Sequence, residues 1–90
     1  MKRIIITVVG HDKVGITAKI TAVLAESNVN ILDINQTLLQ DIFTMVMLCD
    51  IAAANVGFDV LQQKLDAVGE ELGMKILAQK EEIFTYMHRI

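Results

Sequence analysis

The stretch RIIITVVGHDKVGITAKI, residues 3–20, contains the pattern that decides the fold. Residues 3–9 are an almost continuous β-branched run of strand length, which is typical of a strand at the centre of a sheet. A turn from Gly10 to Gly15 follows, and apolar residues then recur at offsets of four, seven and eight from Ile16, as on one face of an amphipathic helix. The stretch therefore predicts a buried strand that continues through a glycine turn into a helix.

The rest of the chain continues this alternation of strand and helix patterns. The first helix is expected to end near residue 27 or 28, where Ser and Asn stand. Four further elements are expected after it: a half-exposed edge strand at 30–39, a strand at 42–51, a helix from an N-cap at Asn55 to a closing glycine at Gly73, and a strand at 74–82. Gln40 and Asp41 form a tight connection, so the two middle strands are expected to make a hairpin.

The order strand, helix, strand, strand, helix, strand defines the fold class. With right-handed crossovers it gives an α+β fold of the ferredoxin-like βαββαβ type, in which a four-stranded antiparallel sheet carries both helices on one face. A chain of 90 residues is expected to form a single domain at 1–90, with a core at 1–82. The C-terminal tail at 83–90 is expected to be a short helix with Ile83, Met87 and Ile90 on one side.

The two strands expected at the centre of the sheet are apolar on both faces. In the first of them the neighbours Ile4 and Ile5 lie on opposite faces, and in the second Met45 and Val46 do, so both faces carry apolar side chains. Because both helices are expected on the same face of the sheet, one apolar set must point away from them. An exposed patch of this kind favours an interface, and we expect a homodimer. The alternative is that the C-terminal tail covers the patch.

Composition and charge argue against several partners and cofactors. The net charge is −3 and acidic and basic residues are interleaved, which argues against nucleic acid and an anionic membrane as partners. No apolar stretch is long enough to span a membrane. Cys49 is the only cysteine, so it forms no internal disulfide or metal-binding pair, and a reducing cytoplasm fits best. We expect no cofactor and no metal, and His88 has no ligand at a suitable spacing.

The residues that known enzyme and RNA-binding motifs need are missing. Ile16 stands where a P-loop places its phosphate-binding lysine. An RNA-recognition motif has the same topology but needs basic charge and stacking aromatics, and the central strands offer only Phe43. A metallochaperone needs Cys-x-x-Cys, and an acylphosphatase-like enzyme needs an arginine in the first loop. His11 is expected to be a solvent-facing loop residue, and Cys49 a core residue without a base. We therefore predict no catalytic residues and no enzymatic activity.

The glycine turn does offer a site for an anion. If the helix begins near Gly15, the N–H groups of Gly15, Ile16 and Thr17 are unpaired and carry the positive end of the helix dipole. A carboxylate is the natural ligand there, and Asp12 at the mouth of the turn would pair with an ammonium group. An α-amino acid carries both charges on one carbon. The alternative is that Asp12 is only the N-cap of the helix and that Gly15 only relieves crowding against the strand.

The segment GHDKVGITAKITAVLAESNVNILDINQT, residues 10–37, resembles the opening of an ACT domain. The match consists of Asp-x-x-Gly at Asp12 and Gly15 and of an apolar-Asn-Ile motif at residues 29–31, and the order of strands and helices agrees over the expected core. The sequence is similar to those of small stand-alone bacterial ACT-domain proteins and of the regulator of glycine cleavage. Val14 departs from the family pattern, because proline is usual there and would make the turn more rigid.

The resemblance implies a regulatory module that binds a small amino acid at the interface of a homodimer. By position, it implies ligand contacts from Asp12 and Asn30, with the backbone of Gly15 beside them. An enzyme or another regulator would be the partner that such a module controls. The alternative left open is a dimerisation or interaction module without a small-molecule ligand.

Overall fold

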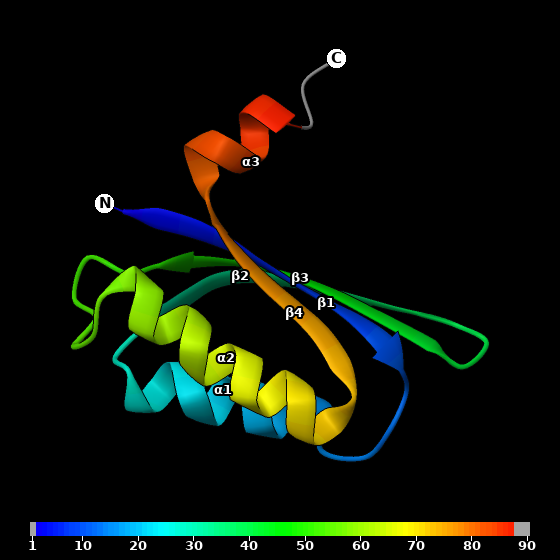
Figure 1. Ribbon diagram of the computed structural model, residues 1–90. Coiled ribbons are helices and arrows are strands. Elements are labelled where there is room, and N and C mark those ends of the chain that lie inside the picture. Colours follow the sequence, from blue (N-terminus) through cyan, green and yellow to red (C-terminus); the bar gives the residue numbers. More distant parts are fainter. Residues whose placement is uncertain (1, 88–90) are drawn as a thin grey trace.

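The computed structural model describes residues 2–87, and it confirms the expected ferredoxin-like arrangement. Figure 1 shows α1 and α2 on one side of the sheet and the short α3 on the other side. The elements follow one another as β1 (Arg3–His11), α1 (Ile16–Glu26), β2 (Asn30–Leu39), β3 (Ile42–Asp50), α2 (Phe58–Leu72), β4 (Met74–Lys80) and α3 (Glu81–Met87).

The sheet is antiparallel and has the strand order β2-β3-β1-β4, so β1 and β3 are central as predicted. Ile6 lies opposite Met47 on β3 and opposite Ala78 on β4. The β2–β3 hairpin closes through two residues, and Gln40 in this turn has a φ of 55°. Gly73 ends α2 with a φ of 69°, which is the left-handed conformation expected of a C-terminal glycine.

The core lies between the sheet and the two long helices. Every second residue of β1 and β3 faces α1 and α2, so buried residues alternate with less buried ones along β3. In β1 the alternation is interrupted, because Ile5 on the other face is buried as well. The fully buried side chains are Ile4, Ile6, Val8, Ile20, Leu24, Met45, Met47, Cys49, Leu61 and Leu65, together with Ser27. Cys49 is thus a core residue as expected, and its burial raises the pKa of the thiol to about 11.

The opposite face of the central strands remains partly open. The side chains of Val9, Val46 and Leu77 are 45%, 38% and 42% exposed on this open face. The α3 helix contacts β1 and β4, and a two-pronged interaction between the Arg3 guanidinium and the Glu81 carboxylate holds its first residue against β1. The tail therefore covers one end of the face and leaves an apolar patch uncovered.

One strand differs from its predicted environment. Residues 30–39 were expected to be half-exposed, yet none of them is buried, and residues 32–39 are exposed on both faces. The edge position of β2 agrees with the sequence pattern, but Ile34 and Leu38 remain 39% and 56% exposed although they pair with core residues of β3. Contacts between α1 and β2 are sparse, so the helix layer does not cover the helix-side face of this strand.

Two element boundaries also differ from the sequence expectations. The N-cap of α2 is Gly57 and not Asn55, and the Asn55 side chain donates a hydrogen bond to the carbonyl oxygen of Glu26 at 3.0 Å instead. The fourth strand ends at Lys80, and the tail helix begins at Glu81, where Arg3 binds it. The predicted roles of Ile90 and His88 fall outside the described residues.

Candidate functional site

The turn between β1 and α1 is built around the conformation of Gly15. Gly15 is the N-cap of α1 and has a φ of 91°, in the left-handed region that L-residues avoid. A Cβ atom built on Gly15 would meet nothing within 4 Å. The idea that this glycine relieves crowding is therefore wrong. The glycine is needed for its backbone conformation, and the space beside it is open.

The Asp12 side chain does not cap α1. No side-chain hydrogen bond caps this helix, and the backbone N–H of Asp12 donates to the carbonyl oxygen of Asp41 at 2.8 Å. The N-cap interpretation of Asp12 is thus wrong. Residues 14 and 15 form a turn that leads into α1, and no side chain caps the N–H groups of Gly15, Ile16 and Thr17 within the described residues. These N–H groups carry the positive end of the helix dipole, and the Asp12 carboxylate in the same turn is exposed and has no ion-pair partner in this part of the chain.

The side chains of the first helical turn fix the position of these amides. The Ile16 side chain is 2% exposed and belongs to the core, so only its backbone N–H is available to a ligand. Thr17 is partly buried, and its carbonyl oxygen accepts a hydrogen bond from the hydroxyl of Thr21 at 2.8 Å. The amides of both residues are therefore held by packing and do not depend on a flexible loop.

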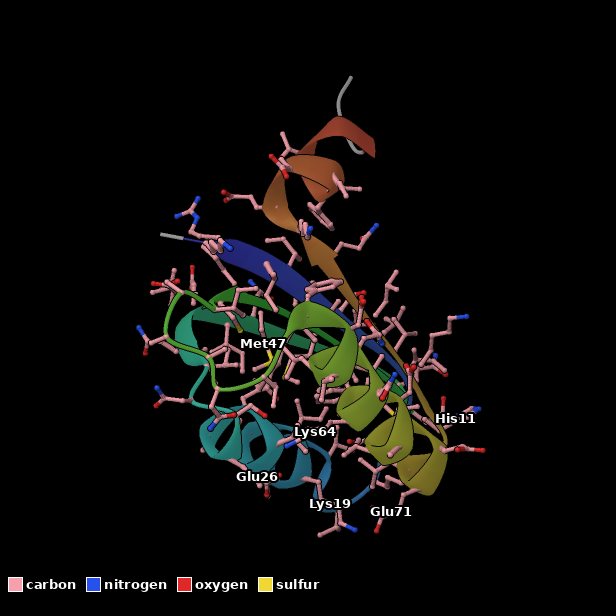
Figure 2. The ribbon with its side chains drawn as sticks, turned by 60° about the vertical axis from the view of Figure 1, so that its left-hand side comes forward. His11, Lys19, Glu26, Met47, Lys64 and Glu71 are labelled. Carbon is pink, nitrogen blue, oxygen red and sulfur yellow. The ribbon has the colours of Figure 1, made fainter. Side chains whose placement is uncertain are left out.

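Ion pairs join α1 to the neighbouring helix. Lys19 pairs with Glu71, and the Lys64 ammonium lies 3.3 Å from the Glu26 carboxylate. Figure 2 shows both pairs between α1 and α2, with His11 at the same end of the molecule as Glu71. Exposed pairs of this kind add little stability, but they connect the start of α1 to the end of α2 and the end of α1 to the middle of α2.

The hairpin supplies an acidic residue that the sequence did not indicate. The carboxylate of Asp41 lies 3.2 Å from Nδ1 of His11, and both side chains are 75% exposed. His11 is thus solvent-facing, as expected, and it joins the glycine turn to the β2–β3 connection. The only available signal was the place of Asp41 in that connection, which becomes informative once β1 and β3 are known to pair.

A single chain does not bring Asn30 close to the glycine turn. Asn30 pairs with Asp50, which pairs with Arg3, whereas His11 pairs with Ile42 at the other end of the same strands. At about 3.4 Å per residue, these two ends of β1 are roughly 27 Å apart. The four candidate residues at 12–17 therefore form one group, and Asn30 stands apart from them.

Two further features bear on the type of site. Across residues 2–87, no three or more His, Cys, Asp or Glu side chains come together in a way that could hold a metal ion. No described helix combines the length and apolar character that crossing a membrane requires. The glycine turn thus remains the candidate site that the sequence indicated, with backbone N–H donors and one free carboxylate.

Residues 2–79 match the model of a protein family described as the ACT domain. The chain belongs to the ACT-domain family. Domains of this family are typically regulatory. The match spans both helices and nearly the whole sheet, so it includes the glycine turn, the edge strand and the open face.

Similar proteins agree with this assignment. The chain is 51% identical to a UPF0237 protein from Methanocaldococcus jannaschii over 90 residues, which cover 100% of each chain. It is 40% identical to an ACT domain protein from Streptococcus pneumoniae, whose structure has a TM-score of 0.80 and is matched over 92% of this chain and 93% of that one. A putative glycine cleavage system transcriptional repressor shares the fold, with a TM-score of 0.73 at 20% identity, over 88% of this chain and 45% of that one.

Proposed function

We propose that this ACT domain is a non-enzymatic sensor that binds a small amino acid between two copies of the chain. The observation that carries the proposal is the start of α1, which no side chain caps, in the same turn as the Asp12 carboxylate, which has no ion-pair partner within residues 2–87. The amides of Gly15, Ile16 and Thr17 are donors for the carboxylate of the ligand, and Asp12 is the partner for its ammonium group. The buried Cys49 thiol is compatible with the reducing cytoplasm in which we place the protein.

Two copies are needed to complete the site. The edge strand β2 runs from Asn30 at one end of the sheet to Leu39 at the end that carries the glycine turn. If two copies pair their β2 edges antiparallel about a two-fold axis, Asn30 of the partner subunit comes to the turn end of the first chain. Its amide then adds a neutral hydrogen-bonding group to the two charged ones.

Asp12→Ala tests whether the carboxylate serves the ligand. Since Asp12 does not cap α1, the substitution should leave the free energy of unfolding unchanged, whereas loss of a cap costs about 1 kcal/mol. The affinity for the amino acid should fall by about 1.5–3 kcal/mol, as expected for a hydrogen bond to a charged group. Calorimetry with the common amino acids at millimolar concentration measures this, with the exposed Glu70→Ala variant as control. If wild-type protein gives no heat with any of them, the sensor proposal fails.

Complementation between variants tests whether the site is shared. Gly15→Leu should block the turn, and Asn30→Leu should remove the amide that the partner receives. In an equal mixture, about half of the dimers are heterodimers, and each has one site in which both components are intact. About a quarter of all sites should therefore bind the amino acid with wild-type affinity. If no sites of wild-type affinity appear in the mixture, the site does not combine these two residues from different chains.

The open face supports a second candidate function. Val9, Val46 and Leu77 expose apolar side chains on the face away from α1 and α2, and such a patch fits a protein interface. The domain would then be a dimerisation or docking module without a ligand, acting on an enzyme or another regulator. A dimer through either surface should bury more than about 1,000 Å² in total. Light scattering at tens of micromolar protein should give the mass of a dimer, and a monomer would contradict the shared-site sensor and the dimerisation module.

A further inference from the structure

A hollow lies at the end of the sheet opposite to the glycine turn. It has a volume of about 820 Å³, within the range of pockets that hold small molecules. It is formed where β1 begins, where β3 continues into the loop at residues 51–57, and where β4 passes into α3. Since none of the residues at 12–17 takes part in it, it is separate from the amino-acid site proposed above.

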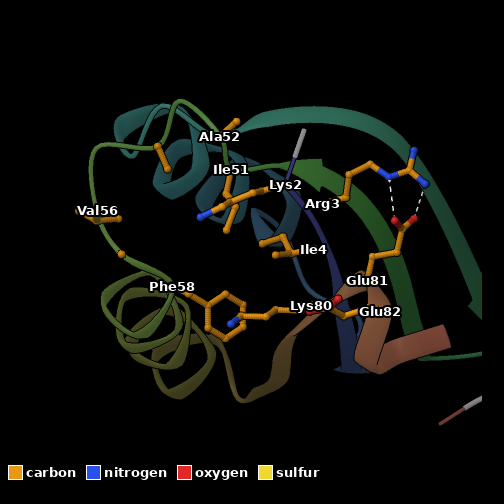
Figure 3. A pocket seen from close by; sticks show the side chains of 12 residues that line it. Lys2, Arg3, Ile4, Ile51, Ala52, Val56, Phe58, Lys80, Glu81 and Glu82 are labelled. Atoms are coloured by element: carbon orange, nitrogen blue, oxygen red, sulfur yellow. Dashed lines mark hydrogen bonds and ion pairs between the residues drawn. The ribbon is translucent and has the colours of Figure 1, made fainter. Parts of the chain in front are cut away.

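The floor and one wall of the hollow are apolar. Ile4, Ile51, Ala54, Val56 and Phe58 line it, and all five are at least partly buried. Figure 3 shows the Phe58 ring on one side of the space and the side chains of Ile4 and Ile51 on another. This lining suits a compact apolar group.

Hydrogen bonds fix the walls before any ligand arrives. The N–H of Ile51 donates to the carbonyl oxygen of Lys2 at 2.8 Å, which joins the start of β1 to the loop. The side chain of Asn28 donates to the carbonyl oxygen of Ala53 at 2.8 Å, and that of Asn55 to Glu26 at 3.0 Å. The loop is therefore tied to both β1 and the end of α1, and a ligand would not have to order it.

The charges around the hollow leave two lysines uncommitted. Arg3 and Glu81 neutralise each other at one side. Neither Lys2 nor Lys80 forms an ion pair within the described part of the chain. The Lys80 ammonium lies 5.8 Å from the centre of the Phe58 ring, and Figure 3 shows both lysine side chains extending into the same space.

The remaining charged groups near the hollow are two acidic side chains and the positive end of a helix. Glu82 is an exposed acid at the rim, and Asp59 lines a smaller neighbouring hollow together with Lys80. The α2 helix begins at the hollow, and its N-cap Gly57 makes no side-chain capping bond. The positive end of this helix adds to the field of the two lysines, and Asp59 in its first turn offsets part of that field.

We propose that this hollow binds a small monocarboxylate that carries a flat or branched apolar body. The carboxylate would lie between the ammonium groups of Lys2 and Lys80, and the apolar body would contact Ile51, Val56 and Phe58. A neutral molecule of the same shape would leave both lysines unpaired, and a bare anion would leave the apolar floor empty. The ligand class follows from the combination of two positive charges with an apolar floor.

Three matched probes separate the contributions of charge and shape. The full-length ¹⁵N-labelled protein is titrated with phenylacetate, with neutral phenylacetamide and with acetate, and amide shifts are followed by NMR. Phenylacetate should bind with a Kd in the millimolar range and shift the amide signals of Gly57 and Phe58. Its affinity should be at least about fivefold higher than that of phenylacetamide or acetate. Equal affinity for phenylacetamide, no saturable shift, or shifts centred on residues 12–17 would overturn the proposal.

Removing a positive or a negative charge at the hollow should change the affinity for phenylacetate in opposite directions. Lys80→Gln should weaken phenylacetate binding about two- to fivefold, and Glu82→Gln should strengthen it by up to about twofold. Lys75→Gln is the control, because Lys75 is an exposed lysine on the same strand but pairs with Val9 near the other end of β1. If Lys75→Gln weakens binding as much as Lys80→Gln does, the effect is one of net charge and the site is refuted.

A steric variant gives an independent test. Ala52 is exposed and lines the hollow, whereas its exposed neighbour Ala53 does not line it. Ala52→Trp should abolish phenylacetate binding, and Ala53→Trp should leave it within about twofold of wild type. Both variants should keep the amide spectrum of the folded sheet. Unchanged binding in Ala52→Trp would show that phenylacetate binds elsewhere.

Discussion

The two long helices both begin at a glycine without a side-chain cap, yet the two glycines play different roles. Gly15 at the start of α1 has a φ of 91°, whereas Gly57 at the start of α2 has a φ of −74° and a ψ of 166°. A Cβ atom would meet nothing within 4 Å at either position. Space is therefore equal at the two starts, and only the backbone conformation distinguishes them.

The surroundings of the two starts differ as well. The amides of α1 open into a turn that holds one carboxylate and lacks Asn30 within the same chain. Those of α2 open into a hollow that a single chain completes with residues 2–4, 51, 52, 54, 56–58 and 80–82. An uncapped helix start is thus not a function in itself, and the neighbouring elements determine which ligand it suits.

The largest difference is expected in ligand binding. Gly15→Leu should abolish binding of any amino acid that raises the melting temperature of the wild type, because the new side chain fills the space beside the α1 amides. Gly57→Leu should leave that affinity unchanged, since Gly57 lies at the other end of the sheet. Thermal shifts at a hundred times the wild-type Kd, where binding adds roughly 2.7 kcal/mol, make the contrast visible. An equal loss of amino-acid binding in both variants would contradict the assignment of the amino-acid site to the start of α1.

Stability without ligand should differ next most strongly. Gly15→Ala forces a side chain into the left-handed region and should cost about 1–2 kcal/mol of unfolding free energy. Gly57→Ala keeps an extended conformation that alanine adopts, so the lower entropy of its unfolded chain offsets much of the weaker cap. Urea unfolding with unchanged m-values measures both substitutions. The same cost at the two glycines would mean that the positive φ of Gly15 is not a constraint.

A smaller effect is expected at the residue that the partner contributes. Asn30→Ala should weaken amino-acid binding by about 0.5–1.5 kcal/mol, the usual size of one hydrogen bond. Asn35→Ala is the control, because Asn35 is also exposed on β2 but lies in the middle of the strand. Isothermal calorimetry compares the two, and an equal loss in both would point to disruption of the edge strand and not to a contact with the ligand.

The smallest effect is expected from adding a cap to α2. Gly57→Ser supplies a hydroxyl that accepts from a first-turn amide and should stabilise the fold by a few tenths of a kcal/mol. The same substitution at Gly15 should destabilise it, because the strain at a φ of 91° outweighs the gain from a cap. Thermal unfolding of the two variants gives opposite signs if this account is right.

Most of the fold could be predicted because its signals are local. The β-branched run of β1, the helical spacing that starts at Ile16 and the glycine at Gly73 each depend on residues within a few positions of one another. The candidate group at Asp12, Gly15, Ile16 and Thr17 also lies within one turn, and the structure keeps it together. Boundaries were harder, as Asn55 shows, because its side chain bonds to the end of α1 and not to α2.

By itself, the sequence determined the order of the elements, the central place of β1 and β3, and the glycine turn between β1 and α1. These follow from the periodicity of side chains along a strand or helix and from the φ angles open to glycine. Only the tertiary structure decided that β2 is exposed on both faces, that Asn30 lies at the far end from the turn, and that Lys2, Phe58 and Lys80 share a hollow. Those features depend on how far the helix layer extends and on which strand ends meet, and neither is encoded in any short stretch of the chain.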